Sequence, residues 1–221
     1  MNYGQKYDVS AAHRHSFTAM IYDAVHNFHQ PESGYRFSAD SLLLAEFASC
    51  GNANRLADLG AGCGIVGLAA LEKGRAPSAE EVFFVEVNPD FLEPLSANIS
   101  LYQPRTAARL RCLQSDWREL KPEDFGGRLD YIMVNPPYFR RNSGRPSRNL
   151  AANAARHEVH GDLGDLCRCL ARLLAPNGRA ALMLPIRREA ELLATLEACN
   201  LEPLRTRRPE KRLVLVEAVP K

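Results

Sequence analysis

The sequence predicts an α/β domain with a seven-stranded, mostly parallel sheet, helices on both faces and an antiparallel hairpin near its carboxyl end. Three observations support this fold class. Short, largely apolar segments alternate with helical patterns, and five of them are expected to form strands, at 55–59, 81–86, 109–113, 129–134 and 179–185. The first leads through a glycine-rich turn into a helix, which is how a doubly wound α/β fold begins. The last two segments, 201–207 and 211–219, flank Pro209 and form the predicted hairpin.

Helices are expected between these strands, and several of their ends carry recognisable signals. Ser38 is a good N-cap residue, and Asn88 followed by Pro89 suits the N-cap and first position of a helix. The Pro-Asn-Gly sequence at 176–178 is expected to end the helix before it. The helices themselves are expected at 39–48, 68–73, 89–101, 163–175 and 189–199.

Residues 34–221 are expected to form one domain, preceded by an irregular arm. Residues 1–33 are polar, histidine-rich and aperiodic, with at most a short helix over 17–22. Of the whole chain, 46% of the residues are hydrophobic and 24% charged, which is typical of a soluble globular protein. No apolar run approaches the ~20 residues of a transmembrane helix, and the first residues lack a signal-peptide pattern. The sequence therefore predicts a cytoplasmic protein.

The cysteines and histidines predict no metal site. The six cysteines are scattered and form no C-x-x-C pair, so buried or ordinary thiols are expected. The pairs His13/His15 and His26/His29 have no cysteine or acidic residue beside them that would complete a ligand set.

The net charge of +2 is unevenly distributed along the chain. Residues 1–134 contain 12 Lys and Arg against 17 Asp and Glu, a difference of −5. Residues 135–221 contain 16 against 9, a difference of +7. The carboxyl-terminal part is therefore expected to face a polyanion, although a solvated arginine surface is the competing interpretation.

A glycine loop follows the first predicted strand and indicates a nucleotide-type ligand. Gly60, Gly62 and Gly64 alternate with other residues, so the backbone can turn tightly and approach a ligand without an intervening Cβ atom. With Gly67 the loop also fits the dinucleotide fingerprint. Asp58, just before the loop, would repel a pyrophosphate but would pair with the cationic end of S-adenosylmethionine.

Two further acids end the next predicted strands. Glu86 lies 26 positions after Gly60, near the ~20 expected for a ribose-binding carboxylate, and its two oxygens can accept from both ribose hydroxyls. Asp116 follows the third strand and can accept from the amino group of an adenine. A solvent-exposed strand-end acid and a turn aspartate are the alternatives.

The sequence Asn135-Pro136-Pro137-Tyr138 follows a buried strand and is the strongest candidate for the catalytic loop. The prolines must end the strand because they lack N–H donors. The side-chain oxygen of Asn135 and the carbonyl oxygen of Pro136 can each accept one N–H of an amino group, and Tyr138 can stack on the plane that carries it. The alternative is a Pro-Pro turn with a structural role. Because the carboxyl ends of parallel strands meet at one edge of a sheet, we expect this loop, the glycine loop, Glu86 and Asp116 to line one crevice.

Together these residues resemble the class I S-adenosylmethionine-dependent methyltransferases, which share a Rossmann-like fold, in the branch with an Asn-Pro-Pro-Tyr motif. More closely, residues 34–219 are similar to the bacterial tRNA adenine-N6 methyltransferases that modify the base beside the anticodon of a valine tRNA. The resemblance implies that the cofactor is S-adenosylmethionine, bound by Asp58, the glycine loop, Glu86, Asp116 and Asn135, and that Asp40 covers its methionine end. It implies that Asn135, Pro136 and Tyr138 act on the substrate amino group, with Pro137 beside them.

The expected product of this resemblance is N6-methyladenine in RNA, most closely at a tRNA anticodon-loop adenine. The arginines expected to bind the RNA are Arg140, Arg141, Arg145 and Arg148 after the catalytic loop, with Arg205, Arg207, Arg208, Lys211 and Arg212 near the end. The alternatives are a protein glutamine or rRNA guanine-N2 methyltransferase, which carry similar loops, and a non-catalytic partner subunit of the same fold. A nucleotide-dependent dehydrogenase is disfavoured by Asp58 and the Pro-Pro loop.

Overall fold

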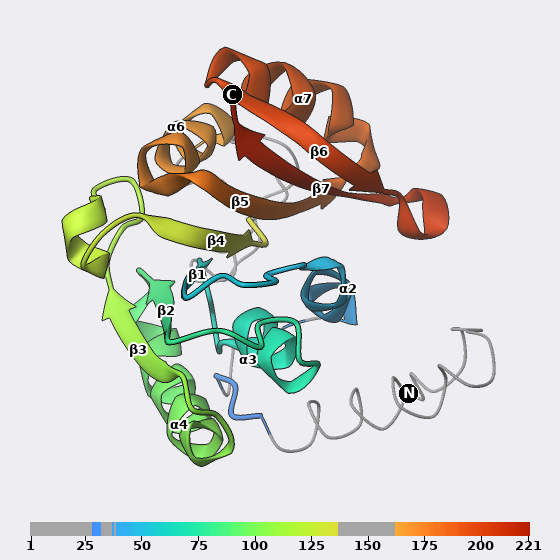
Figure 1. Ribbon diagram of the computed structural model, residues 1–221. Coiled ribbons are helices and arrows are strands. Elements are labelled where there is room, and N and C mark those ends of the chain that lie inside the picture. Colours follow the sequence, from blue (N-terminus) through green and yellow to red (C-terminus); the bar gives the residue numbers. More distant parts are fainter. Residues whose placement is uncertain (1–27, 32–36, 38, 137–161) are drawn as a thin grey trace, which may run out of the picture.

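The predicted seven-stranded sheet is confirmed by a computed structural model, which describes residues 28–31, 37, 39–136 and 162–221 (Figure 1). The strand order is β3-β2-β1-β4-β5-β7-β6. The first five strands pair in parallel, and β7 pairs antiparallel with both β5 and β6. The predicted helix at 17–22 and the polar loop after Tyr138 lie outside the described residues.

The elements alternate along the chain as the sequence patterns require. The strands are β1 (Arg55–Leu59), β2 (Glu81–Glu86), β3 (Arg109–Gln114), β4 (Leu129–Val134), β5 (Leu174–Pro185), β6 (Leu201–Arg207) and β7 (Leu213–Pro220). The α-helices that the structure describes are α2 (Ala39–Phe47), α3 (Ile65–Glu72), α4 (Leu92–Tyr102), α6 (Leu163–Leu173) and α7 (Glu189–Ala198). Short 3-10 turns include η1 (Pro89–Phe91), η4 (Ile186–Arg188) and η5 (Pro209–Lys211). Within the described ranges, no helix is long and apolar enough to cross a membrane.

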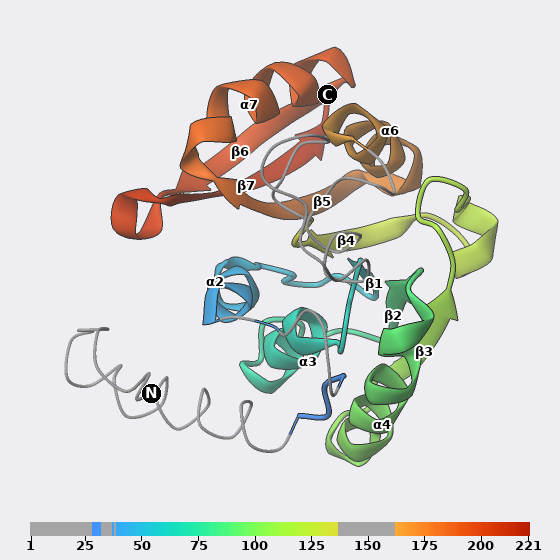
Figure 2. The same ribbon diagram turned by 180° about the vertical axis from the view of Figure 1, so that it is seen from behind.

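Two apolar cores lie on opposite faces of the sheet. Helices α2, α3 and α4 cover one face, and α6 and α7 cover the other (Figures 1 and 2). Because successive strand residues point to opposite faces, Phe84 packs in the first core while its neighbours Phe83 and Val85 pack in the second. The central strands are therefore apolar along nearly their whole length, as strands buried on both faces must be.

Several predicted boundaries shift in the structure, and two of these errors bear on the fold. Helix α6 ends at Leu173 and not at Ala175, because Leu174 already pairs with Leu129 of β4 and begins β5. The Pro-Asn-Gly sequence at 176–178 lies in an irregular part of that strand, where the register with β4 shifts. Helix α3 begins at Ile65 and not at Leu68, so Gly67 belongs to the helix and not to the loop. A Cβ atom at Gly67 would lie 2.5 Å from Phe84, so packing requires this glycine.

Candidate active site

The glycine loop, residues 60–64, is tightly folded against the end of β2. Gly60, Gly62 and Gly64 have φ angles of +70°, +55° and +86°, a region that L-residues with a side chain rarely adopt. The backbone N–H groups of Gly60 and Ala61 both donate to the Val85 carbonyl oxygen, at 2.9 Å each. A Cβ atom at Gly64 would lie 2.8 Å from the Leu95 side chain. The loop therefore needs glycine for both backbone conformation and close packing.

Asp58 lies under this loop and is almost completely buried, with 1% of its surface exposed. The backbone N–H of Gly67, in the first turn of α3, donates to its Oδ2 at 2.8 Å. Burial raises the pKa of Asp58 to about 7, the charge of Glu86 adds to the shift, and the bond from Gly67 opposes it. Asp58 therefore contacts the backbone of the domain and has almost no surface to offer a ligand.

Glu86, the last residue of β2, is held by the backbone on both carboxylate oxygens. Gly62 N–H donates to Oε2 and Asn88 N–H donates to Oε1, at 2.8 Å each. The side chain is 8% exposed. A carboxylate has about four acceptor positions, so these two bonds leave one on each oxygen. The carboxylate is thus fixed in orientation and keeps the capacity to accept two more hydrogen bonds.

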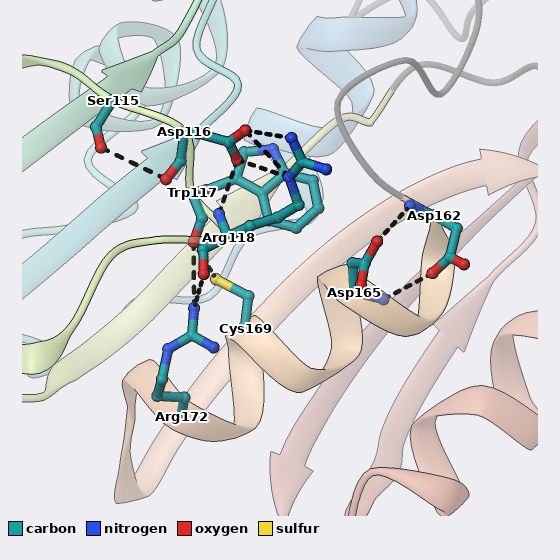
Figure 3. A network of polar contacts seen from close by, with 8 residues as sticks. All are labelled: Ser115, Asp116, Trp117, Arg118, Asp162, Asp165, Cys169 and Arg172. Atoms are coloured by element: carbon teal, nitrogen blue, oxygen red, sulfur yellow. Dashed lines mark hydrogen bonds and ion pairs between the residues drawn. The ribbon is translucent and has the colours of Figure 1, made fainter.

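Asp116 follows β3 and is engaged by its own neighbour Arg118 (Figure 3). The guanidinium Nη2 lies 2.5 Å from Oδ2, and the Arg118 backbone N–H donates to Oδ1 at 2.9 Å. Arg172 of α6 donates to the carbonyl oxygens of Trp117 and Arg118, which fixes this turn against the second core. Any ligand that reaches Asp116 must therefore share the carboxylate with a guanidinium.

Asn135 leaves β4 at the centre of the sheet. Leu59 pairs with Val85 on one side and Val134 on the other, so Gly60, Glu86 and Asn135 follow at the same level on three adjacent strands. Two strand spacings of about 4.8 Å separate the strands of Glu86 and Asn135, so their backbones lie roughly 10 Å apart. The Nδ2 of Asn135 donates to Ser41 Oγ at 3.2 Å. Asn135 and Pro136 are half-buried, whereas Pro137, Tyr138 and Arg140 to Arg148 lie outside the described residues.

Asp40, in the first turn of α2, forms a two-point ion pair with Arg212 beside the β6–β7 turn. The distances from its carboxylate oxygens to the guanidinium nitrogens are 2.5 Å and 3.2 Å. The pair joins α2 to the carboxyl-terminal hairpin.

Comparison with known proteins bears on this arrangement. Residues 36–162, more than half of the chain, match the family described as methyltransferase small domain, and this stretch contains Asp40, the glycine loop, Glu86, Asp116 and Asn135. The chain belongs to the methyltransferase small domain family.

Curated members similar to this chain are tRNA1(Val) (adenine(37)-N6)-methyltransferases. The protein of Shewanella sp. (strain W3-18-1) is 32% identical over 155 residues, which are 69% of this chain and 61% of that protein. The protein of Tolumonas auensis is 29% identical over 214 residues, which are 93% of this chain and 84% of that protein. The matched region thus spans about three fifths of the first relative's length. These matches confirm the family resemblance deduced from the motifs.

Solved methyltransferase structures confirm the fold. The ribosomal protein L11 methylase from Lactobacillus delbrueckii subsp. bulgaricus superposes with a TM-score of 0.57 at 17% identity, covering 83% of this chain and 77% of that one. The precorrin-6y C5,15-methyltransferase from Geobacter metallireducens gives 0.55 at 13% identity, with coverages of 88% and 93%. The Rossmann-like class I methyltransferase fold predicted for this family member is therefore correct.

Sequence reasoning missed three polar residues in segments connected to Asn135 or the glycine loop. Ser41 is 2% exposed and contacts Asn135. Asn98, 3% exposed, donates to the Cys63 carbonyl of the glycine loop and exchanges two hydrogen bonds with the His29 backbone. The buried Oε1 of Gln30, the next residue, has no hydrogen-bond partner within the described part of the chain. A polar residue on the buried face of an apolar helix was the available signal for Ser41 and Asn98.

Proposed function

We propose that this chain transfers a methyl group from S-adenosylmethionine to the N6 amino group of an adenine in tRNA, at an anticodon-loop position. One observation carries the proposal: Asn135 leaves the sheet at the level of Gly60 and Glu86, so an amide that can accept from an amino group stands beside a nucleoside-type site. The curated relatives are named as tRNA adenine-N6 methyltransferases, which supports tRNA as the substrate and the adenine N6 nitrogen as the methyl acceptor.

The residues around the glycine loop fit S-adenosylmethionine. Glu86 keeps one acceptor position on each oxygen for the two ribose hydroxyls, and the glycines leave the loop without Cβ atoms in the way. Asp58 is too buried to touch a ligand, so we assign it a positioning effect through Gly67. Gln30 Oε1 is an acceptor without a partner among the described residues; it follows His29, which Asn98 ties to the glycine loop, and it suits a cofactor amino group. When bound, the cofactor supplies a methyl group on a positively charged sulfur.

Asp116 is assigned to the adenine end of the cofactor, together with Arg118. The carboxylate oxygens accept from the guanidinium and the backbone of Arg118, which fixes their direction. An adenine amino group would add a further donor to this carboxylate. Asp40 is assigned to the methionine end of the cofactor, and its ion pair with Arg212 holds the start of α2 in place.

The acceptor amino group is held by Asn135 and Pro136. Its nitrogen is a weak nucleophile because the lone pair is delocalised into the adenine ring. Acceptors on both N–H bonds favour a tetrahedral nitrogen, which concentrates the lone pair, and hold it in line with the methyl group. Tyr138 is proposed to stack on the extruded base, and Pro137 to stiffen the loop. No strong base is required before the transfer, since the proton is acidic once nitrogen carries the methyl group.

A basic edge beside the site is proposed to bind tRNA phosphates. The backbone N–H of Ile186 donates to the Arg212 carbonyl at 2.9 Å, which joins the turn after β5 to the β6–β7 turn. We define the basic edge as the exposed residues Arg187, Arg207 and Lys211 on and beside these turns. Because β5 is parallel to β4, the turn after β5 and the loop of Asn135 lie at the same edge of the sheet.

Three of the predicted RNA-binding arginines are engaged within the fold. Arg205 pairs with Glu217, Arg208 with Glu189 and Arg212 with Asp40. Their charges are largely balanced, so we give them a smaller part in docking. Arg187 was not predicted from the sequence and joins the edge only because β5 and β7 pair. The arginines at 140, 141, 145 and 148 remain proposed contacts.

The test is methyl transfer from labelled cofactor to separate substrates: unmodified tRNA1(Val), the same tRNA with the adenine after the anticodon changed to guanine, ribosomal RNA and a release factor. We expect label in the first only, recovered as N6-methyladenosine after digestion. Label in the release factor would replace this proposal with glutamine methylation, and label in ribosomal RNA with guanine methylation. Cofactor binding without transfer to any substrate would favour a non-catalytic subunit.

A further inference from the structure

Asn135 must present a particular atom to its substrate, and an amide does not fix this by shape. Its oxygen and nitrogen are nearly equal in size, so the side chain can turn over at little steric cost. Turned one way, Oδ1 faces the substrate N–H; turned the other way, two donors face each other. Catalysis as proposed therefore needs a neighbour that holds the amide by its nitrogen and leaves Oδ1 to the substrate.

Ser41 is placed to hold that nitrogen. Its Oγ accepts from Asn135 Nδ2 at 3.2 Å, across 94 positions of sequence, and the serine is 2% exposed. A hydroxyl can accept or donate, so Ser41 could bond either end of the amide; in this structure its oxygen accepts from the nitrogen, which turns the Oδ1 end of the amide away from Ser41. Since Ser41 is almost completely buried, its hydroxyl is held in place and cannot follow the amide into solvent.

The helix that carries Ser41 is held at both ends by the carboxyl-terminal hairpin. At the start of α2, Arg212 pairs with Asp40, the residue just before Ser41. At its end, Arg205 donates to the Phe47 carbonyl oxygen, and its guanidinium carbon lies 4.1 Å from the centre of the Phe47 ring. These contacts fix α2 relative to the hairpin, which is joined to β4 through β5 in the same sheet, so that the serine hydroxyl has a defined place.

We propose that Ser41 is a positioning residue that orients the Asn135 amide, with Oδ1 directed toward the amino group to be methylated. The inference rests on the proposed function for the identity of that amino group, but the contact itself is independent of it. Ser41 acts through Asn135 and touches neither the acceptor nor the reacting atoms.

The kinetic test compares Ser41→Ala and Ser41→Thr with the native chain, with Ser100→Ala, an exposed helical serine, as matched control. We expect Ser41→Ala to lower kcat about tenfold, the scale of one hydrogen bond. KM for tRNA and Kd for S-adenosylhomocysteine should change less than twofold. Ser41→Thr, which keeps the hydroxyl, should recover most of kcat. A Ser41→Ala variant with native kcat, or one altered only in KM or Kd, would overturn the proposal.

A second measurement does not need turnover. In the ¹⁵N spectrum, the Asn135 side-chain NH2 is assigned by its loss in Asn135→Asp. We expect Ser41→Ala, and not Ser100→Ala, to shift this resonance and speed its hydrogen exchange. An unchanged resonance and exchange rate would sink the Ser41 contact. A native chain that methylates no RNA would overturn the proposed function instead, and the amide resonance would still decide the role of Ser41.

Discussion

The acidic residues beside the glycine loop and the arginines beside the β6–β7 turn are held in opposite ways. Asp58 and Glu86 are buried and accept from backbone N–H groups. Arg208 and Arg212 are about half exposed, and their partners are the side chains of Glu189 and Asp40. A backbone donor cannot swing away, whereas an exposed ion pair is worth little and exchanges readily. We infer that the region beside the glycine loop suits one fixed ligand, and that the region beside the β6–β7 turn suits contacts that form and break.

This difference makes two predictions. Changes beside the glycine loop or at the end of β4 should alter the rate of methyl transfer or the affinity for the cofactor. Changes beside the β6–β7 turn should alter the salt-dependent binding of tRNA. The predictions below are ordered from the largest expected effect to the smallest.

Asn135→Ala is expected to have the largest effect. It removes an acceptor on the substrate amino group, and loss of one preorganised transition-state contact costs roughly 10²–10³-fold in kcat. The affinity for S-adenosylhomocysteine, measured by calorimetry, should stay within about twofold, because Glu86 and the glycine loop are untouched. Retention of most of the activity would show that the loop is only a strand-ending turn.

Glu86→Ala tests whether the backbone-held carboxylate binds the cofactor. The change removes two ribose acceptors and also leaves the N–H groups of Gly62 and Asn88 without their partner. We expect S-adenosylhomocysteine binding to weaken by about 1–3 kcal/mol, the cost of leaving polar groups unpaired. The matched control is Glu93→Ala, an exposed glutamate on α4, which should bind normally. Equal affinities of the two variants would remove Glu86 from the cofactor site.

Glu86 and Asp116 could be picked out from the sequence because they lie at or just after strand ends, and such ends meet in a parallel sheet. The sequence could not show that Asp58 turns toward Gly67, since this depends on how α3 packs against β1. Ser41 was hidden for a similar reason: its partner lies 94 positions away and is reached only through the placement of α2. The end of α6 was misjudged because Pro-Asn-Gly is a turn signal, and tertiary pairing with Leu129 overrode it.

Asp58 predicts a pH dependence of stability with an unusual sign. Burial raises its pKa to about 7 in the folded chain, above the ordinary value of 3.8. Between these values the folded state binds more protons than the unfolded state, so the contribution of Asp58 is complete below pH ~4 and is lost as pH rises toward 7. Urea denaturation at pH 5 and 7 should show the native chain losing roughly 1–2 kcal/mol relative to Asp58→Asn. Parallel pH profiles of the two proteins would contradict the raised pKa.

The smallest effects are expected at the basic edge. Arg187→Ala combined with Arg207→Ala should weaken tRNA binding a few-fold at low salt, with cofactor affinity unchanged. If each side chain contacts one phosphate, the log–log dependence of binding on salt should flatten by about 0.7–0.9 units per arginine. Arg109→Ala is the matched control. Arg109 is exposed, but it begins β3, the outermost strand on the side of the sheet away from β6. Its salt slope should equal that of the native chain. If the double variant and the control kept the same slope, the tRNA would not reach this edge, and docking would depend on the arginines after Tyr138.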